Sequence, residues 1–404
     1  MKKLLSAITK TKNTAQKKHY FLAFYLIAKN LKKEIADKSY RPARFSCFAV
    51  QDPKLREIFA PHFRDRIIHH FLVDKIEPMI DKRFISTSFA NRKGKGIHQA
   101  IKKLQPILRK KTANYFLQID IKNFFPSIDK NILFGFFLKH LQTLPLTKKE
   151  KQTFEFLAHR IIFHDPTNPW PIFTGNKSLL KLVPKHKSLF NTSIEKGLPI
   201  GSLSSQFFAN LYLNELDQFA KHNLKIKYYF RYVDDIIIIA ENTALLSEYK
   251  NAIDYFLKET LKLSLHPNKT IMQPTKNGIN FLGYIIKKDC KFVRRRTVKS
   301  LKRRLYFFNH LFDPVHYPIR NAPQMMSLAK KYRSANWILP INPDFSVLSS
   351  MLATINSYYG IFRFADSFRL RKNLYQNHFG ILTKFFEPKD ETYAIIKIKE
   401  GVYH

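Results

Sequence analysis

Hydrophobic residues follow two different periods that alternate along most of the chain. Apolar positions three and four residues apart predict helices over 63–80, 97–103, 148–163, 197–222 and 243–263. Short β-branched and aromatic runs predict strands over 45–51, 115–121 and 227–240. Beyond about residue 295 the pattern becomes almost entirely helical, with one short strand expected over 393–399. The chain is therefore expected to be α+β, with its main domain boundary near residue 295.

One strand-forming stretch carries two adjacent carboxylates. Residues 228–240 read YYFRYVDDIIIIA, with Asp234 and Asp235 directly before four isoleucines. The simplest geometry is a hairpin with Val233, Asp234 and Asp235 at its turn. Like charges beside a buried strand are costly unless a cation lies close to them, and a divalent metal is the obvious candidate. A solvated turn is the alternative, and this segment alone does not decide between the two.

A third carboxylate ends another expected strand. Residues 115–129 read YFLQIDIKNFFPSID, in which Asp120 closes the strand and Phe124 and Phe125 follow. Asp129 is an expected helix N-cap. A carboxylate at a strand end can project a metal ligand from a rigid sheet, so Asp120 is a candidate partner for the carboxylate pair.

The amino-acid composition predicts that the protein binds a polyanion. The 404 residues hold 70 Lys and Arg against 30 Asp and Glu, a formal charge of +40. Such an excess favours nucleic acid first and an anionic membrane surface second. Apolar runs fall far short of the roughly 20 residues that span a bilayer, and the N-terminus lacks a signal-peptide pattern. With Cys47 and Cys290 lacking metal-ligand spacing, we expect a cytoplasmic protein without a membrane partner.

Two glycine-containing motifs accompany the carboxylates. Residues 92–96 read RKGKG, a basic loop that suits a mobile clamp on a triphosphate or a nucleic-acid backbone, although an ordinary basic loop is equally consistent. Residues 197–206 read GLPIGSLSSQ, and small residues such as Gly201 and Ser205 would let a ligand approach the backbone. Residues 164–196 before them are polar and irregular, as expected for a surface insertion.

In this order the motifs resemble the palm of reverse transcriptases. RKGKG resembles the fingertip motif, Asp120 with Phe125 motif A, and GLPIGSLSSQ motif B. YVDD over 232–235 resembles motif C, Lys269 motif D, and FLGY over 281–284 the primer grip. The resemblance covers roughly residues 40–290. It implies a right-hand polymerase with a split βαβ palm sheet and an all-helical thumb, divided into a basic helical segment (1–38), fingers (39–118), palm (119–292), and thumb with tail (293–404).

The resemblance also implies roles for individual residues. Two Mg²⁺ ions, replaceable by Mn²⁺, would be held by Asp120, Asp234, Asp235 and the carbonyl of Ile121. Lys269 would protonate the leaving pyrophosphate. Deoxynucleotide contacts are expected from Arg92, Lys95, Phe125 (a steric gate against ribose), Gln206 and Tyr232. Contacts with the RNA template and the growing cDNA are expected from Gly201, Ser205, Phe281, Gly283, Arg294, Arg295 and Arg296.

Motif B narrows the resemblance to one branch of the reverse transcriptases. Ile200 and Gln206 stand where many intron and retroviral enzymes carry another pattern, and they resemble diversity-generating-retroelement enzymes and defence-associated bacterial relatives. The implied role is cDNA synthesis on a dedicated non-coding RNA in anti-phage defence, or error-prone copying of a template repeat. The insertion and the long tail favour defence. An accessory protein or a second polymerase subunit could accompany the chain.

Two rival functions stay open at this point. An RNA-templated RNA polymerase commonly has Gly before the paired aspartates, where this chain has Val233. A non-catalytic RNA-binding protein on a polymerase fold would not need the three carboxylates.

Overall fold

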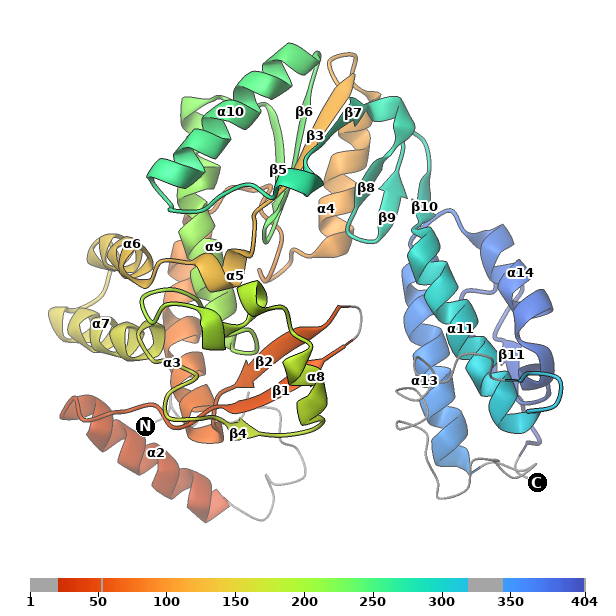
Figure 1. Cartoon of the computed structure of the whole chain (residues 1–404), viewed down its shortest axis with the longest axis horizontal. Helices are drawn as coiled ribbons and strands as arrows, with labels where there is room; N and C mark the ends of the chain where they lie inside the picture. Colours follow the sequence, from red (N-terminus) through yellow and green to blue (C-terminus); the bar gives the residue numbers. More distant parts are fainter. Residues whose placement is uncertain (1–20, 52–53, 319–343, 403–404) are drawn as a thin grey trace. The chain divides into compact units, whose positions relative to one another are not determined.

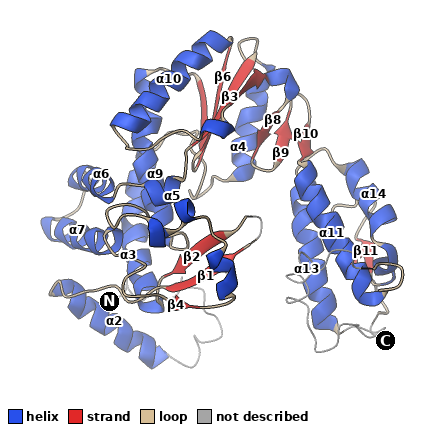
Figure 2. Ribbon diagram, in the orientation of Figure 1, coloured by secondary structure: helices blue, strands red, loops and turns tan. Residues whose placement is uncertain are grey.

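The computed structural model describes residues 21–51, 54–318 and 344–402 (Figure 1). Contacts divide the chain into two compact units, one formed by 1–107 with 111–273 and the other by 108–110 with 274–404. The lysine-rich segment over 1–20 lies outside the described residues, and the part of the predicted N-terminal helix that is described is α2, Phe21–Ala36. Helices and strands are mixed in both units (Figure 2).

A four-stranded sheet forms the centre of the first unit. Its strand order is β5-β6-β3-β7, and β6 runs antiparallel to both of its neighbours. The strands are β3 (Tyr115–Asp120), β5 (Tyr228–Tyr232), β6 (Asp235–Ala240) and β7 (Ile271–Pro274). All four isoleucines of β6 are buried. Because successive strand residues point to opposite faces, both faces of the sheet are covered at this strand.

Helices surround this sheet and fill the core of the first unit. Helix α10 (Thr243–Glu259) packs against β3 and β6, as Figure 1 shows. Helix α9 (Leu203–Gln218) packs against α3 (Phe63–Ile80) and α6 (Lys130–Gln142), and α6 packs against α7 (Lys148–Ile162). The expected N-cap is confirmed, since Asp129 accepts hydrogen bonds from the backbone N–H groups of Asn131 and Ile132, both at 3.0 Å.

Short helical segments connect these elements. They are η1 (Asp81–Arg83), α4 (Ile97–Leu104), η2 (Gln105–Arg109), α5 (Phe124–Ser127), η5 (Phe219–Asn223) and η6 (Pro267–Lys269). The connection from β3 to β5 passes through α5 to α9 and η5. This long excursion splits the palm sheet, in agreement with the expected split βαβ arrangement.

A second, three-stranded sheet in the first unit has the order β2-β1-β4. β1 (Ser46–Val50) pairs antiparallel with β2 (Arg56–Ala60) and parallel with β4 (Ile172–Phe173). The region expected to be an irregular insertion thus contributes a strand, because the backbone of Ile172 donates to the carbonyl of Phe45 at 2.8 Å. The same region holds α8 (Lys177–Lys181), η3 (Lys185–Lys187) and η4 (Leu189–Asn191).

The second unit combines two small sheets with three described helices. Its first sheet has the order β10-β9-β8, from β8 (Ile279–Phe281), β9 (Tyr284–Ile286) and β10 (Lys291–Val293). The helices are α11 (Arg295–Phe312), α13 (Phe345–Phe362) and α14 (Phe368–His378), and η8 (Gly380–Lys384) follows. The sequence-based palm–thumb boundary at 292 stays a prediction, although the contacts group β8 to β10 with the second unit.

The expected all-helical thumb is corrected in one respect. β11 (Phe386–Pro388) pairs antiparallel with β12 (Ile396–Ile398), which lies within the expected final strand. Asn356 of α13 fixes this pair, because its side chain donates to the carbonyl of Ile396 at 2.8 Å and accepts from the N–H of Ile396 at 2.9 Å. A tertiary contact of this kind leaves no trace in the hydrophobic period.

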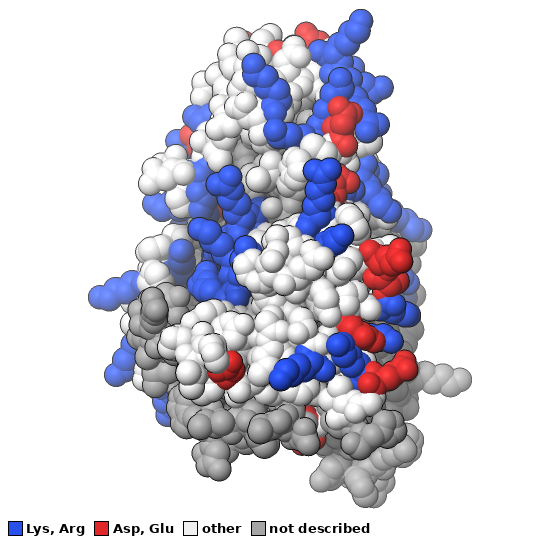
Figure 3. Space-filling view, turned by 90° about the vertical axis from the view of Figure 1, so that its right-hand side faces the viewer, with Lys and Arg blue, Asp and Glu red and all other residues white. Residues whose placement is uncertain are grey.

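Positive charge dominates the surface, as the composition requires. Figure 3 shows one face over which Lys and Arg side chains are spread widely, with Asp and Glu more restricted. Cys47 and Cys290 are unpaired thiols, and Cys47 is buried. Within 21–51, 54–318 and 344–402, no helix has both the length and the apolar character needed to cross a membrane.

Candidate active site

The structure brings the three predicted carboxylates to one end of the palm sheet. Asp120 ends β3 and is paired directly with Asp235, the first residue of β6. Val233 and Asp234 form the turn between β5 and β6, where the N–H of Ile121 donates to the carbonyl of Asp234 at 3.3 Å. The predicted hairpin is therefore confirmed, with Asp235 in the strand rather than in the turn.

The turn has a strained backbone. Val233 has a φ of +56°, a region that β-branched residues rarely adopt. Arg231 holds the turn, because its Nη1 donates to the carbonyl of Val233 at 3.1 Å. Strain at such a position persists only where the surrounding structure enforces it, and such positions are typical of functional sites.

The three carboxylates differ in their surroundings. Burial, and then the negative charge of Asp120, raises the pKa of Asp234, while Lys269 and Arg56 act in the opposite direction. Lys269 Nζ lies 2.7 Å from Asp120 Oδ1, so this predicted catalytic lysine reaches the site. Asp235 Oδ1 accepts a hydrogen bond from Gln118 Nε2 at 3.0 Å. Two carboxylates thus oppose each other electrostatically, and a cation would relieve this repulsion.

The donor chemistry fits a divalent metal held with oxygen ligands. Asp120 and Asp234 offer hard carboxylate oxygens of the kind that Mg²⁺ prefers. Among the residues that the structure describes, no three His, Cys, Asp or Glu side chains gather as a metal cluster. Asp120 and Asp234 would supply part of a coordination shell, which backbone or substrate oxygens would complete.

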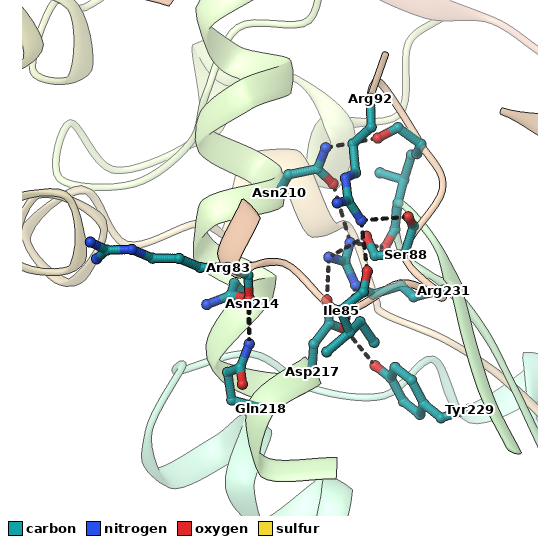
Figure 4. Close-up of polar contacts among 12 residues, drawn as sticks. Arg83, Ile85, Ser88, Arg92, Asn210, Asn214, Asp217, Gln218, Tyr229 and Arg231 are labelled. Carbon is teal, nitrogen blue, oxygen red and sulfur yellow. Dashed lines mark hydrogen bonds and ion pairs between the residues drawn. The ribbon is translucent and has the colours of Figure 1, made fainter. Parts of the chain in front are cut away.

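The side chain of Arg92 is turned into the protein. Its side chain is only 4% exposed and pairs with Asp81, with Nε 2.5 Å from Oδ1. Its Nη1 donates to the carbonyls of Ile85 and Ser88 (Figure 4). Its Nη2 donates to both the carbonyl and the carboxylate of Asp81. All five guanidinium donors are used inside the protein. Arg92 therefore holds its loop together, and its predicted contact with a triphosphate stays a prediction.

Lys95 is likewise turned toward its own loop. Its Nζ donates to the carbonyl of Ser86 at 2.9 Å and lies 5.6 Å from the centre of the Phe89 ring. Burial, together with the charge of Lys103, lowers the pKa of Lys95. Its predicted contact with a nucleotide would require these interactions to break.

The glycine–serine motif packs against the chain itself. Gly201 has a φ of +128°, and a Cβ there would lie 2.6 Å from the carbonyl oxygen of Phe59. The N–H of Phe59 also donates to the carbonyl of Ile200 at 2.8 Å. A close approach that demands glycine is thus made by β2, and the predicted contact of Gly201 with nucleic acid stays a prediction.

Further residues of this motif separate into buried and exposed ones. Ser205 is buried, and its hydroxyl lies 2.8 Å from that of Ser202, the N-cap of α9. Its hydroxyl is thus engaged inside the protein, and its predicted template contact stays a prediction. Gln206 is exposed on the first turn of α9, and Phe125 and Tyr232 are partly exposed. The predicted nucleotide contacts of these three residues stay predictions.

The remaining predicted residues belong to the second unit. Phe281 is buried, and Gly283 has a φ of +95° in the turn between β8 and β9. The carbonyl of Gly283 accepts from the N–H of Arg294 at 3.1 Å, which ties this turn to the start of α11. Arg295 and Arg296 are exposed there. Their predicted contacts with template and primer stay predictions.

Sequence reasoning missed two cations near the carboxylates. Lys54 lies just before β2, and Arg56 is the first residue of this strand. Partial burial, and then the charge of Lys269, lowers the pKa of Lys54, whereas Asp120 raises it. Arg56 acts on Asp234 in the same manner as Lys269. The signal available in the sequence was the basic PKLRE pattern beside a hairpin turn.

A fully buried ion pair supports the turn from below. Arg231 and Asp217 are both 0% exposed, and Nε and Nη2 of Arg231 lie 2.7 and 2.6 Å from the two carboxylate oxygens of Asp217. Burial alone would lower the pKa of Arg231, but Asp217 raises it. Asp217 also accepts a hydrogen bond from the hydroxyl of Tyr229 at 2.9 Å (Figure 4). The guanidinium remains charged inside the core.

The Arg231 guanidinium also hydrogen-bonds to three groups outside the ion pair. Nη2 donates to the hydroxyl of Ser88 at 3.1 Å, and Nη1 donates to Asn210 of α9 and to the carbonyl of Val233. Asn210 in turn donates to the carbonyl of Ala90 at 2.8 Å. One side chain therefore links α9, β5, the loop before α4 and the turn that carries Asp234.

A split sheet with carboxylates at a strand end and in an adjoining hairpin defines a polymerase palm. Residues 50–286 match the family described as reverse transcriptase (RNA-dependent DNA polymerase). The chain belongs to this family. Its membership agrees with the fold and with the order of the motifs along the chain.

Known relatives are distant. The chain is 22% identical to the group II intron-encoded protein LtrA of Lactococcus lactis subsp. cremoris, over 88% of this chain and 66% of LtrA. It is also 22% identical to protein YkfC of Escherichia coli (strain K12), over 67% of this chain and 74% of YkfC. The chain thus spans about two thirds of LtrA. An apo telomerase structure from Candida tropicalis aligns with a TM-score of 0.45 at 11% identity, over 67% of this chain and 60% of that one.

The buried pair yields a prediction about stability. Replacing Asp217 with Asn leaves the buried guanidinium of Arg231 without its counter-charge, which should cost about 3–5 kcal/mol of unfolding free energy. The matched control is Asp254→Asn, which removes the surface pair with Lys258 and should cost well under about 1 kcal/mol. Urea unfolding of both variants measures the difference. Equal losses of unfolding free energy in the two variants would contradict the larger stabilisation expected from the buried pair.

The raised pKa of Asp234 yields a prediction about pH. The folded state binds this proton more tightly than the unfolded state, so ionisation of Asp234 destabilises the fold above its folded pKa. In metal-free buffer, Asp234→Asn should therefore melt at a higher temperature than wild type at pH 7. The difference in melting temperature should vanish below about pH 4, where Asp234 is protonated in both the folded and the unfolded state. Exposed Glu241, just beyond β6, serves as the control through Glu241→Gln; a lower melting temperature for Asp234→Asn at pH 7 would refute the prediction.

Proposed function

We propose that this chain is an RNA-directed DNA polymerase that extends a primer on an RNA template. The observation that carries the proposal is the direct pairing of Asp120 with Asp235, with Asp234 in the adjoining turn under the electrostatic influence of Asp120. This arrangement provides opposed carboxylates at the end of a rigid sheet, as two-metal nucleotidyl transfer requires. Family membership adds the expected template and product.

The proposed reaction is an in-line displacement at phosphorus. The primer 3′-hydroxyl attacks the α-phosphate of a deoxynucleotide and loses its proton to solvent water. A phosphodiester bond forms, and the bond to pyrophosphate breaks. Asp120 and Asp234, with Asp235 and the carbonyl of Ile121 beside them, would hold two Mg²⁺ or Mn²⁺ ions. Bound in this way, the metals would lower the pKa of the hydroxyl and neutralise the leaving group.

The protein's own cations assist the leaving group. Lys269, whose ammonium lies 2.7 Å from Asp120 Oδ1, is assigned the protonation of the departing pyrophosphate. Lys54 and Arg56 supply positive charge from the β1–β2 hairpin and are assigned the triphosphate contacts first expected of Arg92 and Lys95. Gln206 and Tyr232 are assigned to the nucleotide and the templating base.

The sugar is selected by the ring of Phe125. This ring is partly exposed and packs edge-on against Phe124 at 5.4 Å, which restricts its movement. The carbonyl of Phe125 also accepts from the N–H of Leu198 at 3.0 Å. A ring that packs against Phe124 on a backbone held by Leu198 can exclude a 2′-hydroxyl by contact, so deoxynucleotides are favoured.

The biological role is proposed from motif B. Ile200 and Gln206 resemble the diversity-generating and defence-associated branch, and we assign the chain to cDNA synthesis on a dedicated non-coding RNA in anti-phage defence. Error-prone copying of a diversity-generating template repeat is the alternative. Sequencing the DNA made on co-purified RNA separates the two, because the second role requires copying errors within a template repeat.

Loss of one carboxylate tests the chemistry. Asp234→Asn should reduce Mg²⁺-dependent incorporation of deoxynucleotides on a primed RNA template by at least about 1,000-fold, since developing charge is no longer neutralised. Mg²⁺ should also raise the melting temperature of wild type but not of this variant.

The exposed-pair variant Asp254→Asn is the matched control and should keep both properties. Undiminished incorporation in Asp234→Asn would overturn the proposed reaction. A wild-type preference for ribonucleotides would instead favour the RNA-templated RNA polymerase.

Substitution at the sugar gate tests selectivity. Phe125→Ala removes the ring and should improve the use of ribonucleotides relative to deoxynucleotides by about 10-fold or more. Phe125→Tyr keeps the ring and should retain the wild-type ratio. The measurement is the ratio of kcat/KM for a matched nucleotide pair. An unchanged ratio in Phe125→Ala would remove Phe125 from the proposed gate.

A further inference from the structure

The insertion over 164–196 presents exposed aromatic and aliphatic side chains that the proposed reaction does not use. Trp170 is 68% exposed, Leu182 66%, Ile194 63% and Ile172 51%. Single exposed apolar residues are ordinary, but a group of large ones on one segment marks a binding surface. A tryptophan this open is costly to keep in water unless something covers it.

The backbone that carries Trp170 is held in place. Its carbonyl accepts from Nε and Nη2 of Arg44 at 2.8 and 2.5 Å. Two residues further on, β4 pairs with β1 (Figure 1). At the far end of the insertion, buried Glu57 accepts from the hydroxyl of Ser188 at 2.7 Å and from the N–H of Leu189 at 2.9 Å. The insertion is therefore fixed to the sheet at both ends.

Three rings on this segment stack into one aromatic platform, formed by Trp170, Phe173 and Phe190. The Trp170 and Phe190 rings lie 5.7 Å apart at 25°, and Phe173 and Phe190 lie 6.0 Å apart at 26°. Phe190 also contacts buried Phe59 at 5.6 Å, which joins the platform to the core of the sheet. Phe190 thus supports the indole, and most of the indole surface still faces solvent.

Lysines outnumber acids in the insertion. Residues 164–196 contain five lysines, all exposed, against Asp165 and Glu195. The lysines are Lys177, Lys181, Lys185, Lys187 and Lys196. Lys177 Nζ lies 6.0 Å from the centre of the Phe173 ring. Lys187 lowers the pKa of Lys54, which interacts with Asp120, so the charge extends from the insertion toward the carboxylates.

We propose that the aromatic platform binds single-stranded RNA, with an unpaired base stacked on Trp170 and the neighbouring lysines on the phosphates. Stacked rings beside lysines are the combination with which proteins hold single strands, because every base has a π face and every nucleotide a negative charge. A duplex hides its base faces, so an unpaired strand is preferred. The binding is independent of the polymerase chemistry proposed above.

The chain offers a direct optical test. It contains two tryptophans, Trp170 and Trp337, so a full-length Trp337→Phe variant keeps Trp170 as its sole indole. Titration with a 12-nucleotide single-stranded oligouridylate, in buffer with EDTA to stop catalysis, should quench the fluorescence. A perfectly paired RNA duplex of the same length should quench it far less.

Affinity measurements identify the side chain responsible. Trp170→Ala should weaken binding of the labelled oligouridylate by about 10-fold in fluorescence anisotropy, and Trp170→Phe should retain most of the affinity. The matched control is Tyr255→Ala on α10, which removes a ring that is 69% exposed elsewhere in the same unit. This control should bind as wild type does. Circular dichroism melting confirms that each variant is folded.

Several outcomes would overturn the proposal. Unquenched Trp170 fluorescence, or equal affinities of wild type and Trp170→Ala, would show that no base stacks on the platform. If Trp170→Ala instead changes the oligomeric state in light scattering and leaves RNA affinity intact, the face binds a second copy of the chain. Because no catalysis occurs in these assays, their failure is separable from failure of the proposed polymerase activity.

Discussion

The palm depends on one buried charge pair, Arg231 with Asp217. Removing two charges from water is expensive, and the cost is offset only where the geometry is good and the remaining donors are satisfied. Here the contact is bidentate, and the leftover donors reach Ser88, Asn210 and the carbonyl of Val233. The turn that presents Asp234 is therefore fixed from inside the core. Its strained Val233 can persist because Arg231 holds the carbonyl of that residue.

The candidate site is locally acidic, whereas the molecule as a whole is strongly basic. A chain with a formal charge of +40 concentrates three carboxylates at the end of one sheet. Burial and mutual repulsion keep Asp234 hard to ionise, while Lys269, Arg56 and Lys54 stand close by. Positive surroundings attract nucleic acid and nucleotides, and the local negative charge attracts cations. Both properties are needed for phosphoryl chemistry on a polyanion.

The insertion and the fingers behave as one structural element. A parallel pairing with β1, the carboxylate of Glu57 and the packing of Phe190 on Phe59 each bind the insertion to the sheet. Gly201 adds the start of motif B to the same assembly through its close approach to Phe59. The aromatic platform is consequently rigid and continuous with the site that carries Arg56. A mobile surface loop could not hold the rings in a fixed arrangement for stacking.

The sequence by itself determined the main elements and the carboxylate site. Periodicity located α3 and α7 closely, turn chemistry located the cap at Asp129, and the order of motifs brought Asp120 to Asp234. Only the tertiary structure decided which polar groups meet. In the tertiary structure Arg92 pairs with Asp81, and the backbone of Phe59 packs against Gly201. Asn356 hydrogen-bonds to β12, and the ring of Trp170 stacks on that of Phe190. The physical reason is that a hydrophobic period reports which face of an element is buried, whereas the partner on that face is contributed by distant parts of the chain.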